Sequence, residues 1–513
     1  RLFAIEVVVG IGKEHAQVLL SGRIFGTAGD VGIEGVAHIG HDEPDRAAAA
    51  CAKLTSCIVS DKAQFGNGRL HLGARLLRDQ IGVVEHIGYR AQGHSGSGGY
   101  ILDAWRICAH CAIVLKRFNK SSRKCKMSTQ ELFAKLNDQA IELPSWAFGN
   151  SGTRFRVFPS AGVPRDPFEK IEDAAQVHKY SGIAPTVALH YPWDKVDDFA
   201  KLRAHAESLG VALGTINSNT FQDEDYKLGS LAHNDVKVRN KAIDHHFECI
   251  DVMGETHSRD LKIWLADGSN YPGQDDMRRR QDNLHDSLQK IYARLGKDQR
   301  MVLEYKFFEP AFYHTDVPDW GTSYAQVAAL GDRAVVCLDT GHHAPGTNIE
   351  FIVMQLLRLG KLGAFDFNSR FYADDDLIVG AADPFQLFRI MYEVIRGGGY
   401  GAASGVAFML DQCHNIEDKI PGQIRSVLNV QAMTARALLV DTVALEKAQL
   451  AGDVLGANDI FMNAFYTDVR PMLEQWRESK GLAADPVAAF NASGYLKKIA
   501  ETRVGGTQAG WGA

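Results

Sequence analysis

From residue 140 onwards, short apolar or β-branched segments alternate with longer amphipathic ones. This alternation is typical of βαβ units, in which successive strands run parallel. We predict eight strands, at residues 142–148, 186–190, 211–217, 261–266, 301–306, 335–340, 363–368 and 406–411. Eight such units over about 280 residues predict an α/β fold, the (β/α)8 or TIM barrel, whose active residues lie at the carboxyl ends of the strands.

The segments between the predicted strands carry helix signals. Gly210 suits the left-handed position after a helix over 194–209, and Asn348 suits the N-cap of another. The pattern stays helical beyond the eighth strand. We therefore expect a catalytic barrel over 127–430 and a helical extension over 431–513.

The first 126 residues differ in composition from the rest. All ten Met lie at or after Met127, and 14 of the 15 Pro lie after it. Residues 1–126 carry a net charge of +6, whereas the remainder carries −12. Ser128 and Glu131 have the spacing of a capping box that opens a helix. We predict that Met127 is the native start and that the preceding segment has no recognisable fold of its own.

Charge and hydropathy argue against two classes of partner. The net charge of −6 gives no general electrostatic reason to bind nucleic acid. No stretch long enough to span a membrane lacks charged side chains, and no secretory signal is visible. We expect a cytoplasmic protein without nucleic-acid or membrane partners.

Four neighbouring predicted strands end in a carboxylate, and these are Glu304, Asp339, Asp366 and Asp411. The strand ends share one face of a barrel, so the four side chains should converge there. Their repulsion and desolvation would require compensation. A bound divalent cation is the simplest source; the alternative is that each carboxylate pairs with its own lysine or arginine.

A second group of candidate ligands lies next to the first. His342 follows Asp339 by three residues, while Asp374 and Asp376 follow Asp366 by eight and ten. One imidazole and two carboxylates suit a second divalent cation, and two adjacent cations indicate metal-assisted chemistry. By themselves, three consecutive aspartates at 374–376 would also suit a solvated acidic loop.

At these residues the chain resembles L-rhamnose isomerase, especially its bacterial branch with broad aldose specificity. The resembling segments are 144–146, 152–155, 189–194, 267–274, 304–306, 309–313, 339–345 and 411–415. The likeness runs from about residue 140 to 513 and leaves out the N-terminal segment. It implies a barrel of the xylose-isomerase-like type with extra C-terminal helices, a homotetramer, and interconversion of L-rhamnose and L-rhamnulose.

The resemblance also implies roles for individual residues. The residues matching first-metal ligands are Glu304, Asp339, Asp366 and Asp411, and those matching second-metal ligands are His342, Asp374 and Asp376. The residues matching sugar contacts are Lys306, His190, the aromatic walls Trp146 and Trp264, and Phe155, which the family lends to the neighbouring subunit's pocket.

The chain departs from the family at one ligand, because the best-known relatives have a histidine where this chain has Asp366. A carboxylate is a harder ligand than an imidazole, so this replacement favours Mn²⁺ over Zn²⁺, with Mg²⁺ or Co²⁺ as alternatives. The resemblance implies two ions per subunit.

An aldose–ketose isomerase moves a hydrogen between C1 and C2, either as a proton through an enediol or as a hydride. Two cations that hold the sugar oxygens favour the hydride shift. Asp411 would then assist removal of the hydroxyl proton, and Lys306 would stabilise charge on O1.

Three other functions are weighed. A sugar 3-epimerase on the same barrel would use one metal between two carboxylates, and the second ligand group counts against it. A nuclease would need a basic phosphate-binding face, which the charge of −12 after Met127 opposes. A non-catalytic sugar-binding or regulatory protein has only the basic run 116–126 as support.

Overall fold

The computed structural model describes residues 127–153, 156–309, 311–372 and 374–505, and three short strands near the N-terminus. The chain divides into two compact units, Arg1–Lys120 and Ser121–Ala513. In the first unit, β1 (Val8–Gly10), β2 (Gln17–Ile24) and β3 (Val31–His38) form an antiparallel sheet. The rest of the segment before Met127 lies outside the described residues, and Met127 as native start stays a prediction.

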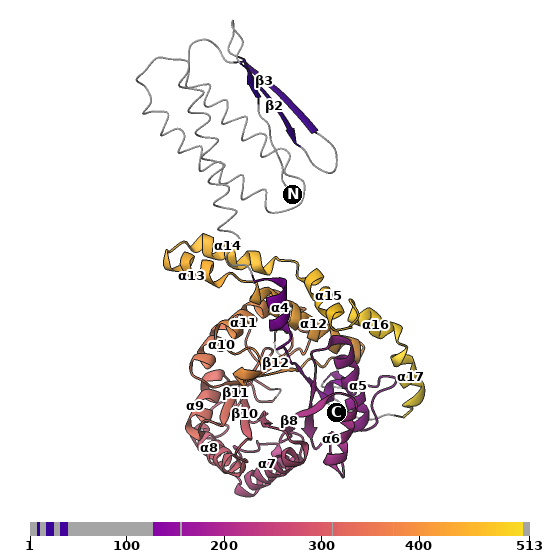
Figure 1. Ribbon diagram of the computed structural model, residues 1–513. Coiled ribbons are helices and arrows are strands. Elements are labelled where there is room, and N and C mark those ends of the chain that lie inside the picture. The colour runs from indigo at the N-terminus through magenta and orange to yellow at the C-terminus, as the bar shows by residue number, and fades with distance from the viewer. Residues whose placement is uncertain are drawn as a thin grey trace. The chain divides into compact units, whose positions relative to one another are not determined.

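Eight parallel strands of the second unit close into a barrel (Figure 1). They are β4 (Glu142–Pro144), β7 (Thr186–Tyr191), β8 (Ala212–Ser218), β9 (Asp260–Ile263), β10 (Arg300–Glu304), β11 (Ala334–Asp339), β12 (Leu362–Phe367) and β13 (Ala407–Leu410). Each strand pairs with the next along the chain, and β13 pairs with β4 to complete the circle. A strand is present at each of the eight predicted places, and the predicted (β/α)8 barrel is confirmed. The first strand is shorter than predicted, because residues 145–148 form a 3-10 helix, η1 (Ser145–Phe148).

A helix follows each barrel strand and covers the outside of the barrel (Figure 1). These helices are α5 (Pro167–Ser181), α6 (Phe199–Ser208), α7 (Val236–Thr256), α8 (Met277–Arg294), α9 (Trp320–Leu330), α10 (Ile349–Arg358), α11 (Pro384–Arg396) and α12 (Lys419–Leu438). Asn348 caps α10 as predicted, accepting from the Phe351 amide at 2.9 Å. The helix predicted from 194 begins only at Phe199, because Asp198 accepts from the Lys201 amide and forms the N-cap.

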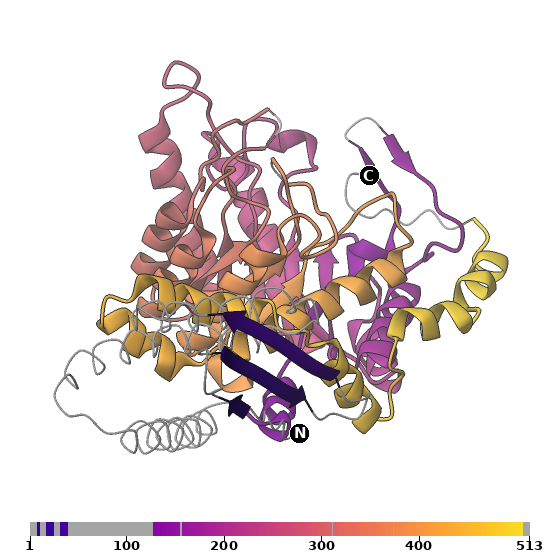
Figure 2. The same cartoon turned by 90° about the horizontal axis from the view of Figure 1, so that it is seen from above.

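The predicted helices outside the barrel are also present. One precedes the barrel, α4 (Thr129–Leu136), and opens with the predicted capping box of Ser128 and Glu131. The others follow it and are α13 (Thr442–Leu450), α14 (Val454–Phe465), α15 (Arg470–Ser479), α16 (Pro486–Ala492) and α17 (Tyr495–Thr502). Figure 2 shows this C-terminal series along the outside of the barrel. The last barrel helix, α12, runs across the boundary expected at 430 and ends at Leu438.

The alternation of side chains along a strand explains how the barrel builds its site. A small apolar cluster of Val302, Val335, Cys337 and Ala364 fills the barrel interior, apart from the main core between strands and helices. Successive side chains of a strand point to opposite faces. Glu304, Asp339 and Asp366 are each two residues beyond a member of this cluster, so they face inward at the carboxyl end.

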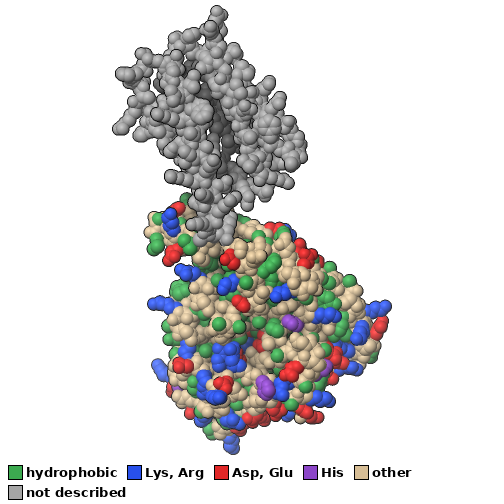
Figure 3. All heavy atoms as spheres, viewed as in Figure 1, with side chains coloured by type: hydrophobic (Ala, Val, Ile, Leu, Met, Phe, Trp, Pro, Cys, Tyr) green, Lys and Arg blue, Asp and Glu red, His purple; other side chains and the backbone are tan. Residues whose placement is uncertain are grey.

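The surface of the second unit mixes both signs of charge. On the face shown in Figure 3, Lys and Arg side chains are interspersed with Asp and Glu, whereas a nucleic-acid-binding surface gathers basic side chains. Among the described residues, no helix combines the length and apolar character needed to cross a membrane.

Candidate active site

Four carboxylates converge at the carboxyl end of the barrel. Glu304 ends β10, Asp339 ends β11, Asp366 is the penultimate residue of β12, and Asp411 directly follows β13. One oxygen from each lies within 4.8 Å of the others. The structure thus brings together the four side chains that the sequence predicts to converge.

Burial and crowding raise the pKa of three of these carboxyl groups, Asp339, Asp366 and Asp411. Burial, with the nearby carboxylates, raises the pKa of Asp339 to about 6 and that of Asp366 to about 7. Burial, with Asp366 and Asp339, also raises the pKa of Asp411 well above its ordinary value. The cluster therefore holds more negative charge than its own contacts compensate. Its oxygen donors are those that hard divalent cations prefer, so the residues fit such an ion.

Asp366 has a lysine partner that the sequence does not predict. Lys262 of β9 is buried, and its Nζ lies 2.5 and 2.6 Å from the two Oδ atoms of Asp366. Burial would lower the pKa of Lys262, but Asp366 raises it well above its ordinary value, so the group is an ammonium. The alternative of a lysine partner is therefore correct for this one carboxylate. Among the described residues, no lysine or arginine forms an ion pair with Glu304, Asp339 or Asp411.

The second predicted ligand group is only partly brought together. His342 Nε2 lies 3.2 Å from Asp374 Oδ1, and His342 Nδ1 lies 3.1 Å from Glu304 Oε1. Among the described residues, His342, Glu304 and Asp339 lie close enough together to form one possible set of metal ligands. Asp376 is buried, and its Oδ1 accepts a hydrogen bond from the side-chain Nδ2 of Asn368 at 3.4 Å. A second cation on His342, Asp374 and Asp376 stays a prediction.

Lys306 is held beside the cluster by two carboxylates. Its Nζ donates to Glu309 Oε2 at 2.6 Å and to Asp374 Oδ2 at 2.8 Å, and lies 5.1 Å from the centre of the Trp264 ring. Burial would lower the pKa of Lys306, but Asp374 and Glu309 raise it above its ordinary value. An ammonium has three N–H donors, so one remains for a ligand.

His190 lies among aromatic side chains that reach the cluster. Its ring stacks on Trp193 at 3.7 Å between centroids and meets the edge of Trp146 at 5.5 Å. Trp146 Nε1 in turn donates to Asp411 Oδ1 at 2.9 Å. Among the described residues, His190 Nδ1 and Trp264 Nε1 are buried without a hydrogen-bond partner. Buried unpaired polar atoms are costly, so these two suit a polar ligand.

Burial lowers the pKa of His190 well below its ordinary value, so the imidazole is neutral. The segment that carries it is fixed by Asp194, which accepts from the His190 amide at 2.7 Å and from Lys170 Nζ at 2.7 Å. Lys170 is not among the residues predicted from the sequence. Phe155, the remaining predicted sugar contact, lies outside the described residues.

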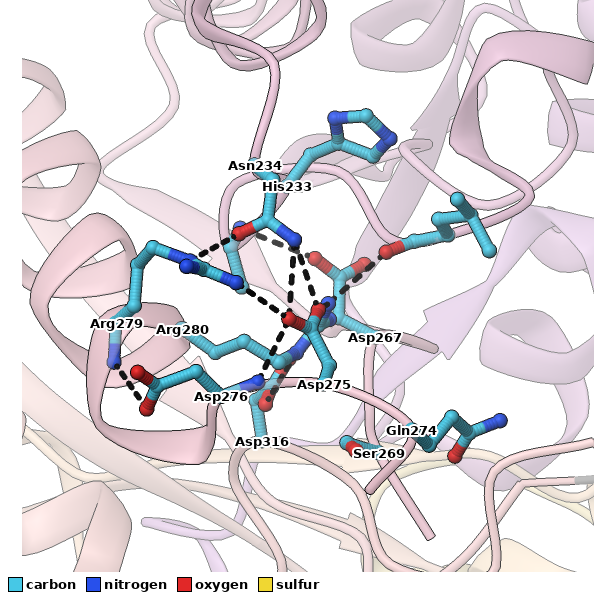
Figure 4. Close-up of polar contacts among 12 residues, drawn as sticks. His233, Asn234, Asp267, Ser269, Gln274, Asp275, Asp276, Arg279, Arg280 and Asp316 are labelled. Carbon is cyan, nitrogen blue, oxygen red and sulfur yellow. Dashed lines mark hydrogen bonds and ion pairs between the residues drawn. The ribbon is translucent and has the colours of Figure 1, made fainter. Parts of the chain in front are cut away.

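A buried ion-pair network braces the loops that follow β8, β9 and β10 (Figure 4). Arg280 of α8 donates to Asp275 at 3.0 Å and to Asp316 at 2.7 to 3.2 Å. The Asp316 amide donates to the Asp267 carbonyl, and the Asp267 carboxylate accepts from the amide and hydroxyl of Ser230.

This network reaches Lys306, because the Thr315 hydroxyl donates to the Lys306 carbonyl and the Lys306 amide donates to the Val317 carbonyl. Arg280 therefore fixes the loop that follows Lys306. The backbone of Gly229 lies close to the Arg280 side chain. A Cβ at Gly229, where φ is +106°, would lie 2.6 Å from the Arg280 guanidinium.

Replacing Arg280 by methionine is expected to lower the free energy of unfolding by about 3 to 5 kcal/mol, since it leaves buried carboxylates without their partner. Chemical denaturation of the purified variant measures this. Arg278→Ala, on an exposed side chain of the same helix, is the control and should stay within about 0.5 kcal/mol of the parent. A loss below about 1 kcal/mol for Arg280→Met would contradict the bracing role.

No family model matches the chain. A probable sugar isomerase of Mesorhizobium japonicum is 44% identical over 376 residues, which make up 72% of this chain and 87% of that protein. A probable sugar isomerase of Rhizobium meliloti is 43% identical over 377 residues, with the same coverage of 72% and 87%.

Two solved structures are similar to part of the chain. A structure of L-ribulose 3-epimerase has a TM-score of 0.42 and 13% identity, over 61% of this chain and 98% of that one. A D-psicose 3-epimerase with D-fructose has a TM-score of 0.40 and 13% identity, over 58% and 97%.

The closed barrel and the polar cluster at its carboxyl end define the class of this protein as a TIM-barrel enzyme. Within that class, the chain belongs to the family of the two sugar isomerases, as its identity to both over most of their length shows.

Proposed function

We propose that this protein is an aldose–ketose isomerase that interconverts L-rhamnose and L-rhamnulose with the help of divalent cations. The observation that carries the proposal is the convergence of four strand-end carboxylates, three of them buried, in a barrel whose relatives are named probable sugar isomerases. The choice of L-rhamnose rests on the resembling segments, which include those that carry His190, Lys306 and Asp411.

The first cation would be held by the carboxylate cluster, and a second by His342, Asp374 and Asp376. Mn²⁺ suits these donors, with Mg²⁺ or Co²⁺ as alternatives. When bound, such an ion supplies a Lewis acid that holds the sugar oxygens and polarises the carbonyl.

The side chains around the cluster supply the remaining chemistry. The free N–H of Lys306 donates to O1 and stabilises the negative charge that develops there. Asp411, whose raised pKa makes its carboxylate a stronger base, takes the proton of the sugar hydroxyl at O2. The bond from Trp146 orients this carboxylate. His190 and Trp264 bind other sugar hydroxyls through their unpaired nitrogens.

The hydrogen then moves from C2 to C1 with its electron pair, and C2 becomes the carbonyl carbon. The proton that Asp411 took from O2 neutralises the charge left on O1, so no solvent proton enters the C–H bond. Turnover in D₂O distinguishes the two routes. Little deuterium at C1 and C2 of the product supports the direct shift, and heavy incorporation at either carbon supports an enediol instead.

The activity is tested by turnover of a panel of aldoses, with and without Mn²⁺, by the full chain and by a chain that starts at Met127. We expect cation-dependent conversion of L-rhamnose to L-rhamnulose by both. If the product is a 3-epimer, the protein is an epimerase and the isomerase proposal is wrong. Sugar binding without turnover would indicate a non-catalytic protein. Light scattering of the same samples tests the homotetramer that the resemblance implies.

Mn²⁺ is expected to raise the melting temperature of the metal-stripped protein by about 5 °C or more at about pH 8, and much less at about pH 5. The folded pKa values of about 6 for Asp339 and about 7 for Asp366 lie above the ordinary 3.8. Without the cation, stability from these groups is therefore lost as the pH rises through 6 to 7. The cation binds the ionised carboxylates, and its binding restores the stability that is lost when they ionise. Equal gains at both pH values would contradict a cation at this cluster.

A further inference from the structure

Lys262 places a permanent positive charge inside the barrel, directly below the carboxylate cluster. The residue lies on β9, whereas its partner Asp366 lies on β12, and β10 and β11 separate the two strands in the sheet. The bond between them therefore crosses the barrel interior. The Met409 thioether also lies close to the ammonium, with its sulfur 3.7 Å from Nζ.

The four carboxylates differ in how they are compensated. Both oxygens of Asp366 accept from the Lys262 ammonium. Asp339, in contrast, accepts from the Gly341 amide and the Asn368 side chain, and Asp411 accepts from the Trp146 indole. Asp366 is thus the carboxylate whose charge already has a fixed cation.

This difference matters for an ion in the cluster. Four ionised carboxylates carry a formal charge of minus four, and Lys262 reduces it to minus three. An ion that uses an oxygen of Asp366 must compete with the ammonium for its lone pairs and approach a like charge. Among the described residues, the other three carboxylates have no lysine or arginine partner; Glu304 lies 3.1 Å from the His342 imidazole, which is itself a candidate ligand.

We propose that Lys262 withdraws Asp366 from the first cation site and lowers the affinity of that site, so that Glu304, Asp339 and Asp411 are its carboxylate ligands. Lys262 is then a positioning residue that sets the strength of cation binding. The inference rests on the proposed cation-dependent function.

The test is Mn²⁺ binding by the metal-stripped full chain, measured by isothermal titration and by electron paramagnetic resonance of the free ion. Lys262→Met should tighten the first site by about tenfold or more, since residues around a metal site change affinity by about 10 to 100-fold. Asp366→Asn, which removes one charge but no proposed ligand, should weaken binding by no more than about tenfold, whereas Asp339→Asn should lose more than about 100-fold. Lys290→Met, on an exposed helix position, is the control and should change nothing.

The double variant Lys262→Met/Asp366→Asn guards against misfolding of the single variants, because it removes both buried charges together. It should bind Mn²⁺ within about threefold of the parent. A loss as large as that of Asp339→Asn, in the double variant or in Asp366→Asn, would show that Asp366 is a ligand and overturn the inference. Unchanged affinity in Lys262→Met would overturn it as well.

Failure of the proposed function gives a different result. If Mn²⁺ binds with the expected order of affinities but no aldose is turned over, the isomerase proposal fails and the role of Lys262 stands. If neither the parent nor Lys262→Met binds Mn²⁺, both proposals are wrong.

Discussion

Replacing Asp339 by asparagine is expected to abolish cation binding and reduce sugar turnover by about 1,000-fold or more, with the barrel still folded. Asp339 is fully buried, and it belongs to both the four-carboxylate group and the group with Glu304 and His342. The amide keeps the shape of the side chain but removes the charge. Titration with Mn²⁺ and turnover of the aldose panel measure the two effects.

The same substitution should not destabilise the metal-free protein at about pH 8. Burial, together with the repulsion of Asp374 and Glu304, disfavours the ionised form of Asp339 and raises its pKa, so a neutral side chain relieves the cluster. Asp332→Asn, at an exposed position just before β11, is the matched control and should leave binding and turnover unchanged. Turnover of Asp339→Asn within tenfold of the parent would exclude this residue from the metal site.

Lys306→Met is expected to lower kcat by about 100 to 1,000-fold, the usual cost of losing one donor to a developing negative charge. The methionine fills a similar volume but cannot donate to O1. It also leaves Asp374 and Glu309 without their cation, so both become freer to attract Mn²⁺. We therefore expect the loss in kcat without a loss of Mn²⁺ affinity.

Lys361→Met separates this effect from the general loss of a lysine. Lys361 is half-buried just before β12 and donates to the carbonyls of Gly331 and Ala334, at the amino end of the barrel. Its removal should lower the melting temperature and leave kcat within about twofold. If Lys306→Met behaves as Lys361→Met does, Lys306 has a structural role and does not stabilise charge on the sugar.

The barrel and the carboxylate cluster are predictable from the sequence because both follow from local patterns. A buried parallel strand is a short apolar run. Because its side chains alternate between the two faces of the sheet, every second residue points inward, and this fixes the last inward position. Glu304, Asp339 and Asp366 could therefore be placed on one face before any contact was known.

The side-chain contacts between distant strands of the barrel cannot be predicted in this way. Lys262 stands between Leu261 and Ile263 in β9, and its position predicts burial but not which of the opposite strands supplies the partner. The same holds for the bond from Trp146 to Asp411, two residues 265 positions apart. The hairpin of β5 (Ser151–Thr153) and β6 (Arg156–Phe158) is missed for another reason, since three-residue strands are too short to show a period.

The seam between β4 and β13 has a consequence for how the enzyme is made. These strands are the first and the last of the barrel, and their pairing places Trp146 beside Asp411. A ribosome therefore releases the indole long before the carboxylate it orients. The candidate site is complete only when the eighth strand has left the exit tunnel and joined the first. Ribosome-bound fragments that stop before Ala407 will lack a working site, however well their earlier strands have folded.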